Sequence, residues 1–230
     1  MQNVLFIVVP REQKYYRMCN LGFKSMITKE IIIHTATQLF LENGVKSITI
    51  NRIVKELHTS KRTLYQHFDD KLDLLKACLA VYHEKIRLEN DQIIESSENV
   101  FEALGYLHQK IVKRSHQVNS NFFNDIIHYY PGLLNESYRH TGNFAHQQLI
   151  YLAEWGIEDG IFHSDMDVEV VGKTVLAMLK MLKDNSQFPV AEYSKERLTF
   201  GILVPYMRGL STKKGLKLLA VQEDLYRVAI

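Results

Sequence analysis

The sequence predicts an all-α protein, and three observations support that prediction. Apolar residues recur at intervals of three and four along most of the 230 residues, which is the spacing of a helix face. Only four prolines and eleven glycines interrupt this pattern. The chain is 46% hydrophobic and 23% charged, the balance of a soluble globular protein with a sizeable core. We expect about nine helices, three in a small N-terminal unit and the rest in a C-terminal bundle.

The first expected helix runs from Thr28 to about Glu42. Thr28 is a suitable N-cap, because its hydroxyl can accept a free N–H of the first turn. Gly44 follows the helix, where a glycine suits the left-handed position that closes many helices. The apolar residues that share one face of this helix are Ile32, Ala36, Leu39 and Phe40.

Two short helices are expected next, within the stretch 49–71. Thr49 and Ser60 are the expected N-caps, and His58 with Thr59 forms the turn between the helices. Asp69 and Asp70 then favour the positive N-terminus of a fourth helix. The inward-facing residues are Ile50, Ile53, Val54 and Leu57 on the first short helix, and Leu64 and Phe68 on the second.

The rest of the chain is expected to be helical. Pro205 should kink or end the last long helix, because proline has no N–H to donate. The expected helices are Lys71–Ile94, Val100–Gln117, Asn121–Tyr130, Leu134–Gly156, Val168–Lys183, Ala191–Arg208 and a short one at Lys213–Leu219, with a loop at Gly156–Asp167.

Charge and cysteine content narrow the function classes. The net charge is only +2, but residues 1–78 are basic and residues 79–230 are acidic overall. This is a modest footprint for binding phosphates. Cys19 and Cys78 form no CxxC pair, so zinc and thioredoxin-like sites have no support, and a reducing cytoplasm is expected. The apolar run Val4–Val9 is too short to span a membrane, so we expect no membrane partner.

The stretch 49–71 has the features of a helix–turn–helix that binds double-stranded DNA. Such a unit places its second helix in the major groove and needs an apolar inside with a polar outer face. Arg and Lys can pair with guanine, and Gln can pair with adenine. The outward-facing polar residues of the second helix are Ser60, Lys61, Arg62, Thr63, Gln66 and His67, with Arg52 on the helix before it. A solvated helix hairpin in any helical bundle would also fit this pattern.

The same residues resemble the N-terminal signature of the tetracycline-repressor-like (TetR) family of bacterial transcriptional regulators. The resemblance covers about residues 27–78, roughly a quarter of the chain. It rests on Thr49-x-x-x-Ile53, on Ser60-Lys61-x-Thr63-Leu64-Tyr65-x-His67-Phe68-x-x-Lys71, on Leu74-Leu75, and on Ala36, Leu39-Phe40 and Gly44 before them.

The resemblance implies roles for individual residues. Residues matching Thr49, Tyr65 and Lys71 contact phosphates in that family, and those matching Lys61, Arg62, Thr63 and Gln66 to His67 face the groove. Two positions depart from the family pattern. Val54 stands where alanine is usual, and His58 stands where glycine is usual in the turn. Because a non-glycine residue is strained in a left-handed turn, we expect a slightly opened turn at His58.

The resemblance also implies a domain organisation. Residues 1–25 form an N-terminal extension, 26–71 the DNA-binding domain, 72–210 a ligand-binding and dimerisation domain, and 211–230 a tail. The extension is expected to be either poorly ordered or a basic arm that contacts DNA through Arg11, Lys14, Arg17 and Lys24. A homodimer is expected through the last two long helices, so that two copies span a palindromic operator. The apolar residues expected there are Val168, Val171, Val175, Met178, Leu182, Leu198, Ile202, Leu203 and Tyr206.

The middle helices are rich in aromatic residues, which makes them candidates for an effector pocket. Ligand pockets are mostly apolar with a few polar groups, and in the family this region surrounds a cavity for a small inducer. The candidate ligand-binding residues are Phe122, Phe123, His128, Tyr129, Phe144, Tyr151 and Trp155. Aromatic residues at helical spacing also form ordinary core, so this alternative stays open.

Enzymatic chemistry has little support in the sequence. Asp125 with His128, and Glu136 with His140, have chelating spacing, but they do not supply a di-iron motif. No HExxH, nucleophile elbow or phosphate-binding glycine loop occurs. We therefore expect no metal, no cofactor and no catalysis. The leading hypothesis is a cytoplasmic, homodimeric repressor released from DNA by a small-molecule effector. The alternative is a helical ligand-binding or interaction protein whose helix–turn–helix does not bind DNA.

Overall fold

The computed structural model describes residues 27–182, 187–189 and 191–227, without the side chains of residues 134–143. The described part is all-α, as predicted, and its one β-bridge joins Phe162 to Ser211. A π-helical turn at Thr199–Leu203 and a 3-10 turn at Glu223–Tyr226 complete the elements. The α-helices are α2 (Lys29–Asn43), α3 (Ile50–Glu56), α4 (Lys61–Tyr65), α5 (Lys71–Ser96), α6 (Val100–Gln117), α7 (Ser120–Tyr129), α8 (Pro131–Glu158), α9 (Val168–Met181), α10 (Lys195–Leu198), α11 (Val204–Leu210) and α12 (Lys213–Gln222).

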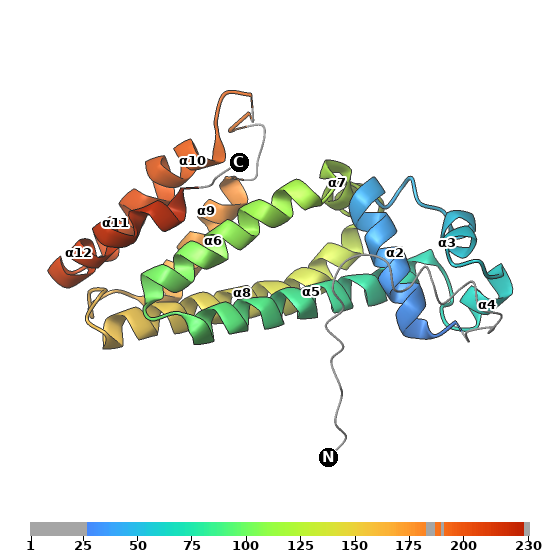
Figure 1. The fold of residues 1–230 in the computed structure, drawn as a ribbon, viewed down its shortest axis with the longest axis horizontal. Helices are drawn as coiled ribbons and strands as arrows, with labels where there is room; N and C mark the ends of the chain where they lie inside the picture. The colour runs from blue at the N-terminus through green and yellow to red at the C-terminus, as the bar shows by residue number, and fades with distance from the viewer. Residues whose placement is uncertain (1–26, 183–186, 190, 228–230) are drawn as a thin grey trace, which may run out of the picture.

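The molecule is elongated, with the three short N-terminal helices at one end (Figure 1). Helix α5 leaves this end and runs along the long axis beside α8, and α6 packs on both. Helices α10 to α12 lie towards the opposite end. The expected extension and its candidate arm residues Arg11, Lys14, Arg17 and Lys24 lie outside the described residues, as do the side chains of Glu136 and His140. No helix in the described ranges combines the length and the apolar character that a membrane crossing requires.

The N-terminal core includes a helix that the sequence suggested for the C-terminal domain. Helices α2 to α5 bury most of the residues predicted from periodicity, among them Ile32, Phe40 and Leu64, each 0% exposed. Ile50 and Leu57 are only half-buried against this core. Phe122 and Ile126 of α7 lie in the same cluster, together with Leu133 of α8. Helix α7 therefore packs as part of the N-terminal core.

A second core lies at the other end of the long helices. It joins the C-terminal part of α5 with α6, α8, the loop before α9, and the last helices. Tyr226 is 2% exposed and donates its hydroxyl proton to the carbonyl of Phe101 at 2.8 Å. Gly215 allows α12 to approach the loop, since a Cβ there would lie 2.2 Å from the carbonyl oxygen of Ile161. Residues 211–227 are thus packed against α6.

Three expectations need correction. Helix α4 ends at Tyr65, although Phe68 still donates its N–H to Leu64 and is buried. The last long helix starts at Lys195 instead of Ala191, and it contains the π-helical turn ahead of Pro205. In that turn the N–H of Val204 donates to the carbonyl of Thr199, five residues back. The helix therefore does not end at Pro205 and continues to Leu210. The third correction concerns Gly44, whose φ of 82° is positive but whose ψ of 161° is extended, outside the left-handed helical region.

Candidate nucleic-acid interface and ligand cleft

Side-chain caps fix the start of each helix at the N-terminal end. Thr49 accepts a hydrogen bond from the N–H of Arg52 at 3.2 Å, and Ser60 accepts one from Thr63 at 3.1 Å. Asp70 accepts the N–H of Asp73 at 2.8 Å and so starts α5. Each cap satisfies a backbone donor that the helix itself cannot pair. The boundaries of α3, α4 and α5 therefore follow from local chemistry.

The turn between α3 and α4 is closed around His58. This residue has a φ of 48°, the one positive φ among the described non-glycine residues. The N–H of Thr59 donates to Val54 at 2.9 Å, and the N–H of His58 donates to Lys55 at 3.2 Å. This pair of bonds is a Schellman motif, in which the left-handed residue follows the C-cap. The expected opening of the turn is therefore wrong, because the histidine adopts the conformation that a glycine would.

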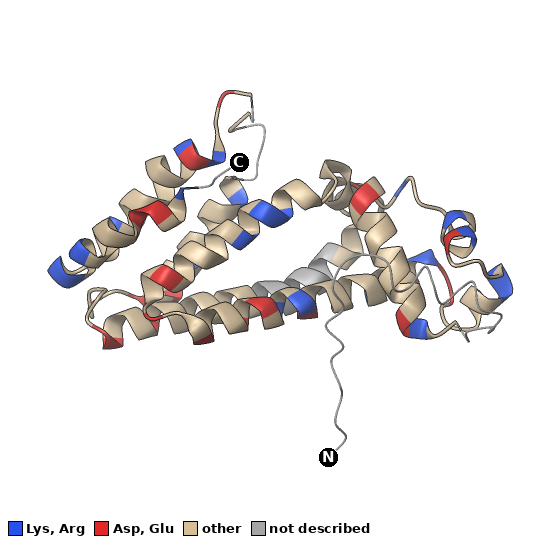
Figure 2. Ribbon diagram, viewed as in Figure 1, with Lys and Arg blue, Asp and Glu red and all other residues tan. Residues whose placement is uncertain are grey.

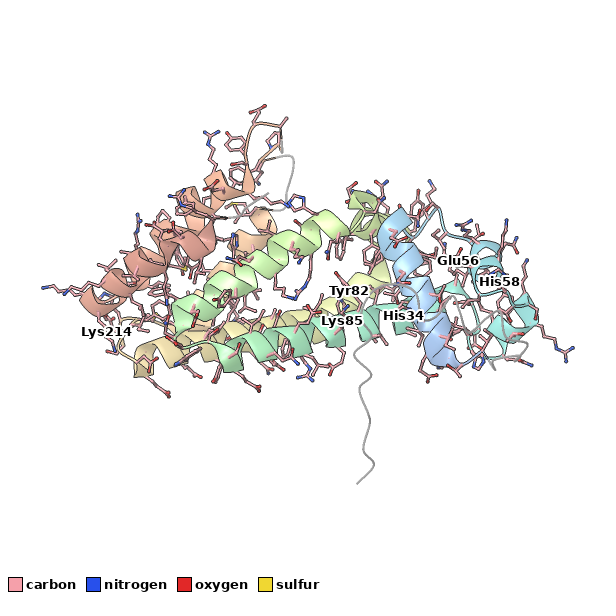
Figure 3. All side chains as sticks on the ribbon, in the orientation of Figure 1. His34, Glu56, His58, Tyr82, Lys85 and Lys214 are labelled. Carbon is pink, nitrogen blue, oxygen red and sulfur yellow. The ribbon has the colours of Figure 1, made fainter. Side chains whose placement is uncertain are left out.

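The outer face of α4 presents unshielded polar groups. Lys61, Arg62 and Gln66 are exposed, and Tyr65 is 49% exposed. Neither Lys61 nor Arg62 forms an ion pair within the described ranges. Figure 2 colours the Lys and Arg positions of α3 and α4 blue on the ribbon at this end of the molecule, and Figure 3 labels His58 there. The cations and the amide are thus free to meet a ligand.

The other predicted DNA-binding residues of α3 and α4 form contacts within the protein or are partly buried. Arg52 is exposed and lies 3.6 Å from Glu56 on the same helix. The hydroxyls of Ser60 and Thr63 lie 3.0 Å apart, and Thr63 is half-buried. His67 is also half-buried. Arg52 and Ser60 are thus exposed, while Thr63 and His67 are partly covered.

Lys71 turns inward at the start of α5. Its ammonium donates to the carbonyl of Val45 at 2.6 Å and lies 5.8 Å from the centroid of the Phe40 ring. The side chain is half-buried, and this burial lowers the pKa of its ammonium. In the structure Lys71 therefore ties the loop between α2 and α3 to α5.

The predicted ligand-binding residues fall into separate places. Phe122 is 2% exposed in the N-terminal core, and Phe123, His128 and Tyr129 are exposed on α7. Trp155 is half-buried against the second core. Phe144 and Tyr151, both on α8, lie together at a cleft. Seven residues predicted as one pocket are thus divided among two cores, one helix surface and one cleft.

The cleft lies between α5 and α8 and has a volume of about 320 Å³. Its polar groups include Asp91, whose carboxylate accepts from Arg87 at 2.7 Å, and Arg87 lies 6.0 Å from the Phe144 ring centroid. The lining residues are Asp91, Ile94, Glu95, Phe144, Gln147, Gln148 and Tyr151. The sequence missed the residues from α5 and both glutamines, because only the pairing of α5 with α8 brings them together.

The Asp125 and His128 side chains are not arranged as a metal site. The carboxylate of Asp125 accepts the backbone N–H of Lys46 at 2.7 Å, while His128 is exposed on the same helix. Across the residues that the structure describes, no three His, Cys, Asp or Glu side chains gather to hold a metal. Cys78 is buried, and burial raises the pKa of its thiol to about 11, so it stays protonated at neutral pH.

Comparison with known proteins agrees with this geometry. Residues 32–78 match the family model described as bacterial regulatory proteins, tetR family. The chain is 26% identical over 145 residues to the HTH-type transcriptional repressor KstR2 of Rhodococcus jostii (strain RHA1), covering 60% of this chain and 70% of that protein. It is 50% identical over 46 residues to the HTH-type transcriptional regulator SAUSA300_2515 of Staphylococcus aureus (strain USA300), covering 20% of this chain and 25% of the relative.

A solved structure shares the fold over most of the chain. It is a putative transcriptional regulator from Saccharomonospora viridis in complex with choline, with a TM-score of 0.62 and 18% sequence identity. The match covers 79% of this chain and 96% of that one. The family model matches only residues 32–78, whereas the shared fold covers 79% of this chain. Residues 32–78 therefore match the tetR family of bacterial regulatory proteins, and most of the chain shares the fold of this solved structure.

Proposed function

We propose that the protein is a homodimeric transcriptional repressor that binds a palindromic DNA operator and leaves it when a small molecule binds the C-terminal domain. The observation that carries the proposal is the α3–α4 unit. Its inside is packed and capped, while Lys61, Arg62, Tyr65 and Gln66 remain exposed on one side. A short helix with a polar outer face fits the major groove.

Each exposed residue has a role that its chemistry suits. Arg62 and Lys61 can donate to guanine, and Gln66 can donate to and accept from adenine. Tyr65 and the hydroxyl of Thr49 can donate to phosphates, which fix the position of the protein on the duplex. The closed turn at His58 supports this use, because it holds α3 and α4 in one rigid unit.

The apolar surface of α9 supports dimerisation. Val171, Val175 and Met178 are only half-buried, and Val170 is 55% exposed, although α9 is one of the most apolar helices. Ile202 and Tyr206 of the last long helix are half-buried as well. A second copy would remove these side chains from water and place two α4 helices on successive turns of DNA.

The cleft between α5 and α8 is the proposed effector site. Its mixture of Phe144 and Tyr151 with acidic and amide groups suits an organic ligand with polar substituents. Helix α5 lines the cleft near its C-terminal end and begins at Lys71, next to α4. A ligand that favours one position of α5 would move α4, provided that it binds the two positions with different affinity. This activity places the protein in the cytoplasm of a bacterium, with its DNA.

The test is a titration of labelled DNA from upstream of the protein's own gene, with unrelated DNA as competitor. We expect a preference of at least about 1,000-fold for the specific sequence, as for other DNA-binding regulators. Arg62→Ala and Gln66→Ala should each reduce the preference by about 5- to 150-fold.

Lys217→Ala is the matched control for these substitutions. Lys217 is an exposed cation on α12, far from α4, so its loss should leave both the preference and the affinity unchanged. If the parent protein binds specific and unrelated DNA alike, the repressor proposal is overturned.

A further inference from the structure

The loop between α2 and α3 is held by α7, which comes from much later in the chain. Asn119 donates its backbone N–H to Leu41 at 2.8 Å and its side-chain amide to Glu42 at 3.1 Å. Asp125 accepts the backbone N–H of Lys46 at 2.7 Å. We call these contacts of Asn119 and Asp125 the α7 clasp. It grips both the end of α2 and the loop that leads to α3.

Gly44 allows the clasp to close. A Cβ at this position would lie 2.9 Å from the Oδ2 atom of Asp125 and 3.3 Å from the Cβ of Asn121. The first distance is too short for any side chain, and the φ of 82° disfavours one as well. The glycine thus lets the carboxylate of Asp125 reach the backbone of the loop.

The charge of Asp125 faces two cations of the DNA-binding end. Lys46 follows the gripped backbone, and its ammonium lies 4.8 Å from the centroid of the Tyr129 ring on α7. Lys71 donates to Val45, the residue before Lys46, and the negative charge of Asp125 opposes the burial that lowers the Lys71 pKa. One carboxylate therefore holds the loop and stabilises the ammonium that ties the loop to α5.

We propose that Asp125 is a positioning residue for operator recognition. Its carboxylate fixes the Gly44–Lys46 loop, and the loop in turn aims the α3–α4 unit. Only Ser47 and Ile48 separate Lys46 from Thr49, the N-cap of α3. The position of Lys46 therefore restricts the position of the start of α3. This inference rests on the proposed function, since aiming matters only if α4 meets DNA.

The position of the clasp predicts how its loss would appear. The internal bonds of the α3–α4 unit do not involve α7, so the unit keeps its caps and its closed turn. The number of phosphates that it can contact stays the same, and only its average orientation spreads. Affinity should fall while the salt dependence of binding, which counts phosphate contacts, should not change.

The experiment compares Asp125→Ala and Asp125→Asn with the parent protein in two measurements. Hydrogen exchange at the Lys46 amide, followed by NMR without DNA, should accelerate about 10- to 100-fold in Asp125→Ala, because a bond to a charged acceptor is lost. Asp125→Asn should show a smaller increase, since an amide oxygen still accepts. Operator affinity should fall about 5- to 10-fold in Asp125→Ala, with an unchanged salt slope.

Leu219→Val is the control for stability alone. Leu219 is 1% exposed in the second core, so the substitution lowers stability without touching the clasp. Affinities are compared at a temperature where all variants are folded by circular dichroism. We expect the control to bind the operator like the parent.

Several outcomes would overturn the inference. Unchanged exchange in Asp125→Ala would show that the bond does not hold the loop. Faster exchange with unchanged affinity, a changed salt slope, or an equal loss of affinity in Leu219→Val would each remove the positioning role. A parent protein without any DNA preference would instead overturn the proposed function, and the exchange data, taken without DNA, would show the state of the clasp independently.

Discussion

Helices α2 and α9 have similar lengths and are both largely apolar, yet their surroundings differ. Helix α2 buries Ile32, Ala36, Leu39 and Phe40, whereas Gly172 is the one buried residue of α9. Helix α2 is covered by α5, α3 and α7, while α9 packs mainly on α8. The difference indicates that the N-terminal end is completed within one copy of the chain. Helix α9 retains apolar surface that a second copy could cover.

The largest effect should come from a cavity made in the N-terminal core on α7, a helix distant in the chain from α2 to α5. Ile126→Ala removes a side chain that is 1% exposed, and we expect a loss of about 2–5 kcal/mol in the free energy of unfolding. Ile127→Ala, on the same helix but 48% exposed, should change it by no more than about 0.5 kcal/mol. Urea unfolding followed by circular dichroism measures both. Equal losses would show that α7 does not belong to the N-terminal core.

A charge on α9 should have the next largest effect. Val175→Arg places a cation on the proposed dimer surface, and we expect a monomer by analytical ultracentrifugation. Operator affinity should fall by about 100-fold or more, because the two half-sites are no longer bound together. Val221→Arg is the control, since Val221 is 81% exposed on α12. A dimer that persists in Val175→Arg would remove α9 from the interface.

Lys71 tests whether a residue held within the core also contacts DNA. Lys71→Met keeps the aliphatic stem but removes the ammonium from Val45 and from any phosphate. If Lys71 contacts a phosphate, the slope of log affinity against log salt should become shallower by about one. Loss of the internal bond should also cost about 1 kcal/mol of stability. An unchanged slope with lower stability would assign Lys71 to structure alone.

The left-handed turn predicts a small gain in stability. His58 at a φ of 48° carries a conformational cost of about 1–2 kcal/mol that glycine avoids, although glycine loses more entropy on folding. His58→Gly should therefore raise the free energy of unfolding by up to about 1 kcal/mol. Thermal unfolding would detect this, and a clear loss of stability would mean that the imidazole makes a stabilising contact.

The smallest effect should come from His108, through the pH dependence of the free energy of unfolding. Burial lowers the pKa of His108, whose ring nitrogen lies 3.1 Å from the hydroxyl of Thr199. The folded chain therefore binds this proton less readily than the unfolded chain does. The contribution of neutral His108 to the free energy of unfolding is fully present above about pH 6.5, the ordinary pKa of histidine. This contribution is lost as the pH falls below that value. His108→Gln should make the acid decline in the free energy of unfolding less steep, as measured by chemical unfolding at several pH values. His83, also half-buried, has a lowered pKa and contributes with the same sign.

The starts of the N-terminal helices could be predicted because the signals of the N-caps are local. Thr28, Thr49, Ser60 and Asp70 each cap a donor within the next three residues. The turn at His58 was located correctly but expected to open, since its two closing bonds depend on the backbone of α3 and cannot be inferred from the histidine itself. The aromatic residues of α7 and α8 that the sequence offers as one candidate set lie in separate places, because composition does not say which face of each helix is covered.

The sequence by itself determined the helical class, the helix–turn–helix and its exposed polar face, because caps and apolar spacing act over a few residues. The tertiary structure decided that α7 joins the N-terminal core, that Lys71 bonds to Val45, and that α5 and α8 enclose a cleft. These features depend on pairs far apart in the chain, such as Asp125 and Lys46, which are 79 residues apart. Such contacts form only when whole helices pack together, and a local sequence pattern does not specify which helices pack against each other.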